Sequence, residues 1–283
     1  MLQARSRRRA PLVMPTTVHI RRSYAECRYG QMHMVTAYPS GGGFDERVPL
    51  VCLHPSASTS QYFGPLLPEL GRDRSIYAFD IPGFGNSDAP TGEFSLTEIA
   101  VLLGDFVESL RLRQVDVLGL QLGALTAIEM ANQKPQQLRR LVIGSVPHFT
   151  PQEMRSPEWT TMPALPLDDG SHLLKDWQRL QQSRGGHVSA DQLTEELAEV
   201  LHSRRRSAPV QHAMLEYPTA KRLAGLRQSA LILRPRDEYY DHTLRAKNSC
   251  PQAFMEDLPE SGSNIFAHNA QHVLQAMRQY LDR

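Results

Sequence analysis

Three features are scarce in this sequence of 283 residues: cysteines, long apolar runs and an excess of charge of one sign. The cysteines are Cys27, Cys52 and Cys250, and they form neither a Cys-x-x-Cys pair nor a Cys/His cluster. A disulfide framework or a zinc site is therefore not expected, and a cytoplasmic location fits best. We expect no metal and no other cofactor.

The small number of long apolar runs and the charge balance exclude further classes. No apolar run approaches the roughly 20 residues that a membrane-spanning helix needs, so no membrane partner is expected. Lys and Arg number 31 and Asp and Glu 30, a balance that argues against nucleic acid as a partner. Hydrophobic residues make up 41% of the chain, as in a globular protein, and its composition does not indicate an oligomeric state.

The N-terminal segment is basic. Arg5 and the run Arg7 to Arg9 precede the first acidic residue, Glu26. No apolar segment follows of the kind that a secretory signal requires. Residues 1–23 are therefore predicted to be a disordered basic tail.

Strand-like and helix-like segments alternate from residue 24 onward. A hairpin is expected over residues 25–38, with its turn at Gly30 and Gln31. Short apolar runs predict buried strands at 48–53, 75–79, 115–118 and 141–143. Ser95 and Glu98 have the spacing of a capping box at the start of a helix, and a second helix is expected over 122–134.

The pattern changes at residues 147–218, where prolines and charged helical stretches (173–182 and 191–204) replace the strands. This segment is predicted to be an inserted helical cap. Alternation resumes with a strand at 230–233, a helix after Asp241, a strand near 253–255 and a helix over 269–281. Residues 24–146 and 219–283 then form one core, a parallel sheet with helices on both faces. Ligands bind such sheets at the carboxyl ends of the strands.

Three motifs follow three of the predicted strands. They are Leu-His-Pro-Ser at 53–56, Asp-Ile-Pro-Gly-Phe-Gly-Asn-Ser at 80–87 and Val-Leu-Gly-Leu-Gln-Leu-Gly-Ala at 117–124. Together they resemble the α/β-hydrolase superfamily across residues 24–281, and the second matches the family's D-x-x-G-x-G-x-S loop. The resemblance implies an α/β-hydrolase fold: a mostly parallel eight-stranded sheet with helices on both faces and an inserted helical cap.

The third motif occupies the nucleophile elbow of the family but departs from its G-x-S-x-G pattern. Gln121 stands at the nucleophile position, between Gly119 and Gly123. A carboxamide donates and accepts hydrogen bonds and is a poor nucleophile. Covalent catalysis of the Ser or Cys type is therefore not expected at this position.

The other two members of the family's triad also require comparison. Asp237 matches the position of the acid, with Glu238 beside it as the alternative. Ser263 follows Gly262, where the family has its histidine, and His268 and His272 lie further along. With this alignment two of the three triad members are missing.

Several polar groups are still expected around the pocket. The backbone N–H of Leu122 and a donor on the loop near Ser56 match the family's oxyanion donors, because Pro55 has no N–H. His54 is the best remaining acid/base candidate, with a structural histidine as the alternative. His148 either overlooks the pocket or belongs to a hinge of the cap.

Three functions remain open for a chain expected to bind a small, partly apolar molecule between core and cap. The favoured one is an enzyme without a serine nucleophile: a lyase, isomerase, cyclase or water-activating hydrolase. The second is a catalytically inactive pseudo-hydrolase that binds a small molecule. The third is an ordinary hydrolase whose triad lies elsewhere in the sequence.

Overall fold

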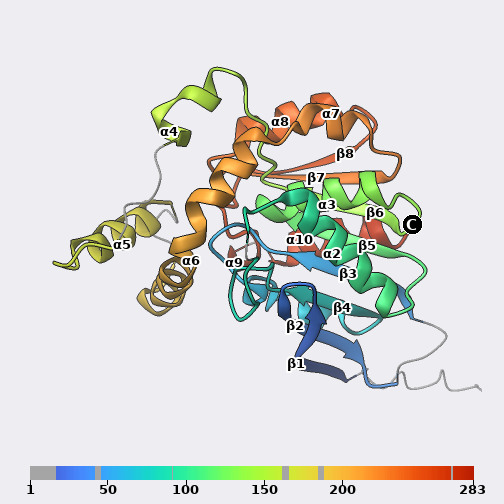
Figure 1. The fold of residues 1–283 in the computed structure, drawn as a ribbon. Helices are drawn as coiled ribbons and strands as arrows, with labels where there is room; N and C mark the ends of the chain where they lie inside the picture. Colours follow the sequence, from blue (N-terminus) through green and yellow to red (C-terminus); the bar gives the residue numbers. More distant parts are fainter. Residues whose placement is uncertain (1–16, 42–45, 91, 161–165, 184–187, 269) are drawn as a thin grey trace, which may run out of the picture.

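The computed structural model describes residues 17–41, 46–90, 92–160, 166–183, 188–268 and 270–283. Eight strands form one sheet in the order β1-β2-β4-β3-β5-β6-β7-β8, and β3 to β8 run parallel to one another. The predicted eight-stranded, mostly parallel sheet is thus confirmed (Figure 1). The strands are β1 (Val18–Cys27), β2 (Gly30–Pro39), β3 (Arg47–Leu53), β4 (Arg74–Phe79), β5 (Val115–Leu120), β6 (Leu138–Gly144), β7 (Ser229–Pro235) and β8 (Phe254–Leu258).

Helices cover both faces of this sheet. Successive side chains of β3 alternate between them: Val51 and Leu53 join one apolar cluster, and Leu50 and Cys52 join the other. The first cluster includes α2 (Leu96–Ser109), α3 (Leu122–Gln133), α7 (Thr219–Ala224) and α8 (Tyr240–Ser249). The second includes η1 (Ser60–Phe63), α1 (Leu67–Leu70), α9 (Ile265–His268) and α10 (Ala270–Leu281).

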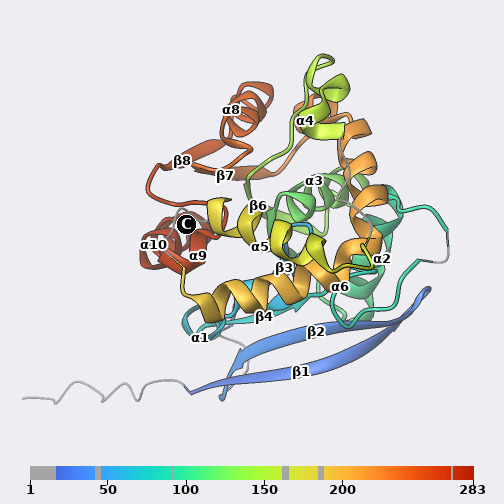
Figure 2. The ribbon, with the colours of Figure 1, turned by 90° about the vertical axis from the view of Figure 1, so that its left-hand side faces the viewer.

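Helices also occupy the chain between β6 and β7. They are η2 (Glu153–Arg155), α4 (Pro157–Thr160), α5 (Ser171–Ser183) and α6 (Ala190–Glu216). Figure 2 shows α5 and α6 lying across the edge of the sheet at which the parallel strands end. α6 continues through Pro209, and its last turns bury Val210 and Met214 in the same apolar cluster as α3. The C-terminal part of the expected cap is therefore also part of the core.

The N-terminal hairpin differs from the expected one. β1 begins at Val18 and pairs with β2 along its whole length, from Val18 opposite Pro39 to Cys27 opposite Gly30. Residues 18–23 are thus strand and not tail, because β2 offers a continuous antiparallel partner; residues 1–16 lie outside the described part. The turn is at residues 28 and 29, and Gly30 has a φ of 116°, which glycine adopts readily.

At the start of α2, one of the two hydrogen bonds of the expected capping box is formed. The Ser95 hydroxyl accepts a hydrogen bond from the backbone N–H of Glu98 at 3.3 Å. The Glu98 carboxylate accepts a hydrogen bond from the Tyr29 hydroxyl at 2.9 Å, and so ties the helix to the hairpin.

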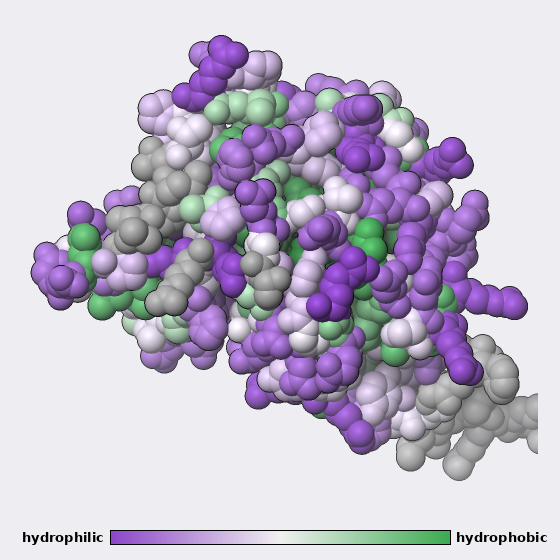
Figure 3. All heavy atoms as spheres, in the orientation of Figure 1, coloured by the Kyte–Doolittle hydropathy of each residue, from purple (hydrophilic) through white to green (hydrophobic). Residues whose placement is uncertain are grey.

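The face of the molecule drawn in Figure 3 is mostly hydrophilic. Hydrophobic side chains gather at its left-hand tip, over α5, where Leu173 and Leu174 are exposed. Within the described residues, no helix combines the length and the apolar composition needed to cross a bilayer.

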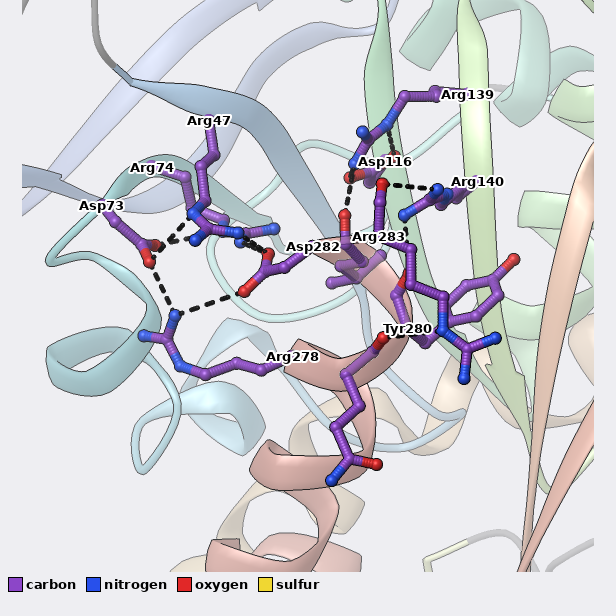
Figure 4. A network of polar contacts seen from close by, with 12 residues as sticks. Arg47, Asp73, Arg74, Asp116, Arg139, Arg140, Arg278, Tyr280, Asp282 and Arg283 are labelled. Atoms are coloured by element: carbon purple, nitrogen blue, oxygen red, sulfur yellow. Dashed lines mark hydrogen bonds and ion pairs between the residues drawn. The ribbon is translucent and has the colours of Figure 1, made fainter.

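A network of charged side chains ties α10 to the strands (Figure 4). The side chain of Arg74 on β4 is fully buried and forms ion pairs with Asp282 and, at 3.3 Å, with Asp73. Arg278 of α10 binds Asp73 at 2.6 Å. The buried charge of Arg74 therefore holds Asp282 to β4, and the partly exposed pair of Arg278 with Asp73 adds a second link just before the strand.

We expect Asp282→Ala to lower the free energy of unfolding by about 3 kcal/mol, because it removes a partner from the buried guanidinium of Arg74. Arg28→Ala is the control: Arg28 and Asp105 are about half exposed, and such pairs contribute about 1 kcal/mol or less. Urea denaturation measures both variants. Equal losses in the two would contradict the role assigned to Asp282.

Candidate functional site

A cavity of about 860 Å³ lies between the loops at the carboxyl ends of the strands and the helices α5 and α6. Both polar and apolar residues line it, which suits the partly apolar ligand that the sequence predicts. Polar liners include Ser56, Gln121, Ser145, Asp237, Glu238 and Ser263; apolar liners include Phe84, Leu120, Trp159, Leu180, Val200 and Val210. Four of the residues expected at the site are thus gathered around one space, namely Ser56, Gln121, Asp237 and Ser263.

Gln121 sits on the sharp turn between β5 and α3. Its backbone has a φ of 53° and a ψ of −110°, and it directly precedes the first residue of α3. A side chain at a positive φ is strained, and such strain persists only where the surrounding packing imposes it. The position of Gln121 is therefore that of a nucleophile elbow, as the motif predicts.

The two glycines of the motif explain why this turn forms. A Cβ atom on Gly119 would lie 2.2 Å from the carbonyl oxygen of Gly123, and one on Gly123 would lie 2.0 Å from that of Leu53. Any side chain at either position would therefore push α3 away from β5 or from β3. The glycines allow the close approach that the elbow requires.

The Gln121 carboxamide is held at both of its ends. Its oxygen accepts hydrogen bonds from the backbone N–H of Ser56 at 2.9 Å and from the Ser56 hydroxyl at 2.7 Å. Its nitrogen donates to a carboxylate oxygen of Glu238 at 3.1 Å. The side chain therefore has one defined orientation in the cavity. Burial raises the pKa of the neighbouring Tyr239 hydroxyl.

Asp237 has a serine as its partner. The Ser145 hydroxyl donates to one carboxylate oxygen at 2.5 Å, and the backbone N–H of Tyr239 donates to the other at 2.9 Å. Burial raises the pKa of Asp237 to about 6 from its usual 3.8, although the hydrogen bond from Ser145 acts in the opposite direction. Ser145 itself has a φ of 48° and Ala57 one of 57°, so two further residues with a strained backbone line the cavity.

No imidazole lines the cavity among the residues that the structure describes. Ser263 lines it on the loop after β8, and its backbone carbonyl accepts a hydrogen bond from the Tyr62 hydroxyl at 2.8 Å. His272 is more than half exposed on α10, where it contacts Glu256 at 2.8 Å. The side chain of His268 lies outside the described part.

His54 has a structural position, which corrects its expected role as an acid or base in the pocket. The residue is fully buried; its Nε2 accepts from the backbone N–H of Ile81 at 2.9 Å, and its Nδ1 lies 2.7 Å from the carbonyl oxygen of Pro55. The ring is therefore neutral, with its proton on Nδ1. Burial lowers the pKa of His54, which favours this neutral form further.

Two further residues expected to bind a ligand do not line the cavity among its described side chains. His148 contacts Ser249 at 3.0 Å, and its backbone N–H donates to His242 on α8. His148 lies in the segment between β6 and η2, and its role as a hinge of the cap stays a prediction. The side chain of Leu122 is fully buried, and only its backbone N–H at the start of α3 has a place near the elbow.

The loop after β4 supports the floor of the site through Asp80. Its carboxylate accepts from the backbone N–H groups of Ser60 at 2.7 Å and Asn86 at 2.9 Å, and it contacts His33 at 2.8 Å. Burial opposes ionisation of Asp80, but these N–H groups outweigh it and lower its pKa. A Cβ atom on Gly85 would lie 2.2 Å from the same carboxylate, so the glycine of the motif is required.

Sequence reasoning missed Ser145, Tyr239 and Glu199. Ser145 directly follows β6, and Tyr239 lies four residues after the end of β7, so their position near the carboxyl ends of strands was an available signal. Glu199 of α6 accepts hydrogen bonds from the hydroxyls of Ser58 at 3.0 Å and Thr59 at 2.6 Å, and burial raises its pKa. Nothing in the sequence marks this contact between α6 and the core.

Parts of the chain are similar to two curated enzymes, a depolymerase and a hydrolase. It is 27% identical over 97 residues to a poly(3-hydroxyalkanoate) depolymerase of Ectopseudomonas oleovorans, covering 34% of each chain. It is 30% identical over 111 residues to a 2-hydroxymuconate semialdehyde hydrolase of a Pseudomonas species, covering 38% of each. The chain therefore spans just over a third of the length of these relatives.

The fold is shared over nearly the whole chain. The enol-lactonase of Burkholderia xenovorans superposes with a TM-score of 0.77 at 15% identity, covering 92% of this chain and 100% of that one. The sequence profile described as "Alpha/beta hydrolase family" matches residues 50–276, which include the elbow, Asp237 and Ser263. With strand order, elbow and profile in agreement, this chain belongs to the alpha/beta hydrolase family.

Proposed function

We propose that this protein binds a small, partly apolar molecule in the cavity between core and cap and releases it chemically unchanged. The observation that carries the proposal is the Gln121 carboxamide at the elbow, held at its oxygen by Ser56 and at its nitrogen by Glu238. A carboxamide held by these hydrogen bonds can fix the positions of the groups that line the cavity. It cannot attack the carbonyl group of a bound molecule.

The other groups of the site support binding without covalent chemistry. His54 is enclosed between backbone groups, so it cannot take a proton from a ligand. Asp237 accepts from Ser145 and Tyr239, which fixes the loop after β7. Since no hydroxyl or thiol paired with an imidazole faces the cavity among the described residues, the second of the three hypotheses fits best.

The named activities of the relatives favour the third hypothesis, an ordinary hydrolase. Those relatives are named as a depolymerase and a hydrolase, but the matched segments cover just over a third of each chain. The elbow residue argues against this hypothesis, because hydrolysis through an acyl-enzyme needs a hydroxyl or thiol where Gln121 stands. The proposed location is the cytoplasm, where the three free cysteines would stay reduced.

One observation favours a second function, an enzyme that moves a proton. Asp237 lines the cavity with a pKa of about 6, so near neutral pH it can exist in both protonation states. Such a carboxylate could activate a water molecule or catalyse an isomerisation without any nucleophile at the elbow. Recovery of a bound molecule in altered form distinguishes this function from binding alone.

The unmodified protein should not hydrolyse p-nitrophenyl acetate and should not be labelled by a fluorophosphonate probe, because the elbow has no hydroxyl. Gln121→Ser alone should stay inert, since a serine and its base act as a unit. Only the double variant Gln121→Ser, Ser263→His, which adds an imidazole on the loop after β8, should show weak turnover.

Absorbance of the released nitrophenolate measures ester hydrolysis, and intact-protein mass spectrometry measures labelling by the fluorophosphonate. Turnover by the unmodified protein that Gln121→Ala abolishes would contradict the proposal. Turnover that survives Gln121→Ala and is lost in Asp237→Asn would establish the second function instead.

Val200→Trp should abolish ligand binding, because Val200 of α6 lines the cavity and the indole would fill part of it. Ala198→Trp is the matched control: Ala198 is exposed on the same helix and does not line the cavity. Saturation-transfer NMR with a library of neutral, partly apolar fragments measures binding. Equal binding to both variants would place the ligand outside this cavity.

Stability should respond to the ionisation of Asp237. Because its pKa is about 6 in the folded protein against an ordinary 3.8, the folded state binds this proton more tightly than the unfolded chain. The carboxyl group therefore contributes less stability as pH rises from about 4 to 6, by up to about 3 kcal/mol. Asp237→Asn has no carboxyl group at this position and does not lose this stability. Its free energy of unfolding should therefore rise relative to that of the unmodified protein between pH 4 and 6.

Urea denaturation at pH 4, 5, 6 and 7 measures the difference in free energy of unfolding between the two proteins. Asp191→Asn, at an exposed position in the first turn of α6, controls for the loss of one carboxyl group. A difference between Asp237→Asn and the unmodified protein that stays constant from pH 4 to 7 would exclude the raised pKa.

A further inference from the structure

The groups around the end of the Gln121 side chain form a complementary set. Two donors of Ser56, the backbone N–H at 2.9 Å and the hydroxyl at 2.7 Å, point to its carbonyl oxygen. An acceptor of Glu238, at 3.1 Å, faces its nitrogen. A carbonyl oxygen next to an NH₂ group matches this arrangement, and an ester or a carboxylate lacks the hydrogen that Glu238 accepts.

The position of the donors matters as much as their number. Ser56 N–H is the first backbone donor after Pro55, on the loop that follows β3 and faces the elbow. Donors at 2.7–3.1 Å from an oxygen are those that a fold of this kind aims at the carbonyl of a bound molecule. In this chain the oxygen they meet belongs to the chain itself.

We propose that Ser56 and Glu238 form a binding subsite for a primary carboxamide and that Gln121 is its tethered occupant. While Gln121 fills the subsite, no carbonyl group of a ligand can bind there. Gln121 thus determines specificity, because it restricts ligands to the part of the cavity toward Trp159 and α6. This goes beyond the proposed function, because it holds whether or not the ligand leaves unchanged.

The backbone at the elbow makes the subsite accessible to experiment. Gln121 has a φ of 53°, which glycine adopts without strain, so Gln121→Gly should fold. The substitution also removes a CH₂CH₂CONH₂ group, and the space left behind has the shape of propionamide. The two Ser56 donors and the Glu238 acceptor remain in place to bind that molecule.

The test is binding of propionamide to Gln121→Gly. We expect a dissociation constant on the order of 1–10 mM, measured by titration of the Ser56 backbone amide resonance in ¹H–¹⁵N spectra, since five heavy atoms limit the affinity. The unmodified protein should show no shift at Ser56 at the same concentrations. Gln114→Gly is the matched control and should also show none, because this exposed glutamine precedes β5 and Gln121 follows it.

Chemical selectivity is the second part of the test. Propionate and methyl acetate should bind Gln121→Gly at least about tenfold more weakly than propionamide, because one is repelled by Glu238 and the other gives it no hydrogen. Ser56→Ala in the Gln121→Gly background should weaken the binding of propionamide, since the hydroxyl donor of Ser56 is lost. A folded Gln121→Gly that binds propionate or methyl acetate as well as propionamide, or binds none of them, overturns the proposal.

A measurement on the unmodified protein covers the case in which Gln121→Gly does not fold. The Ser56 backbone amide should be protected from hydrogen exchange, and the Gln121 side-chain NH₂ should give two separate, slowly exchanging resonances. Exchange of both groups at the rate of open loop amides would show that the subsite is not occupied and would overturn the proposal.

Discussion

The backbone of Gln121, held at a φ of 53°, is the constraint on which the whole site depends. Strand β5 must end and helix α3 must begin within one residue, and this is possible because Gly119, Gly123 and the Leu53 carbonyl group approach without side chains between them. Strain of this kind costs about 1–3 kcal/mol, which the packing of α3 against β3 and β5 must offset. The elbow therefore presents its side chain to the cavity whatever residue occupies it.

Around this elbow, polar groups satisfy one another. Ser56 and Glu238 hold the carboxamide, Ser145 holds Asp237, and the backbone encloses His54. A hydrolytic site keeps a nucleophile and a base in contact with each other and open to substrate. Here the fold and the cavity are retained, while the hydrogen bonds that would link nucleophile to base run to other partners.

The sequence permitted prediction of the sheet and the elbow because both depend on local rules. Short apolar runs at 48–53 and 75–79 marked β3 and β4, and the spacing of Gly119 and Gly123 marked the turn. The start of β1 at Val18 could not be predicted, because pairing with β2 rather than composition makes those residues a strand. The prediction of an acid/base role for His54 was wrong for a related reason. Its partners are backbone groups of Pro55 and Ile81, which no pattern of side chains in the sequence reveals.

Contacts between distant segments were the least predictable part of the site. Glu238 was predicted only as an alternative for the acid. Its contact with Gln121 depends on how the loop after β7 is placed relative to the turn after β5. Glu199 meets Ser58 and Thr59 because α6 crosses the cavity, and a helical pattern does not indicate where its helix will lie.

Helix α6 belongs to two parts of the molecule. Its first half carries Glu199 over the cavity, and beyond Pro209 it buries Val210 and Met214 beside α3; Tyr217, which follows the helix, donates to the buried Glu129 at 2.9 Å. Residues 147–218 are therefore not an exchangeable module: a chimera that replaces all of them with the matching segment of a relative would remove part of the hydrophobic core. A graft that ends before Pro209 would exchange the roof of the cavity and leave the native core in place.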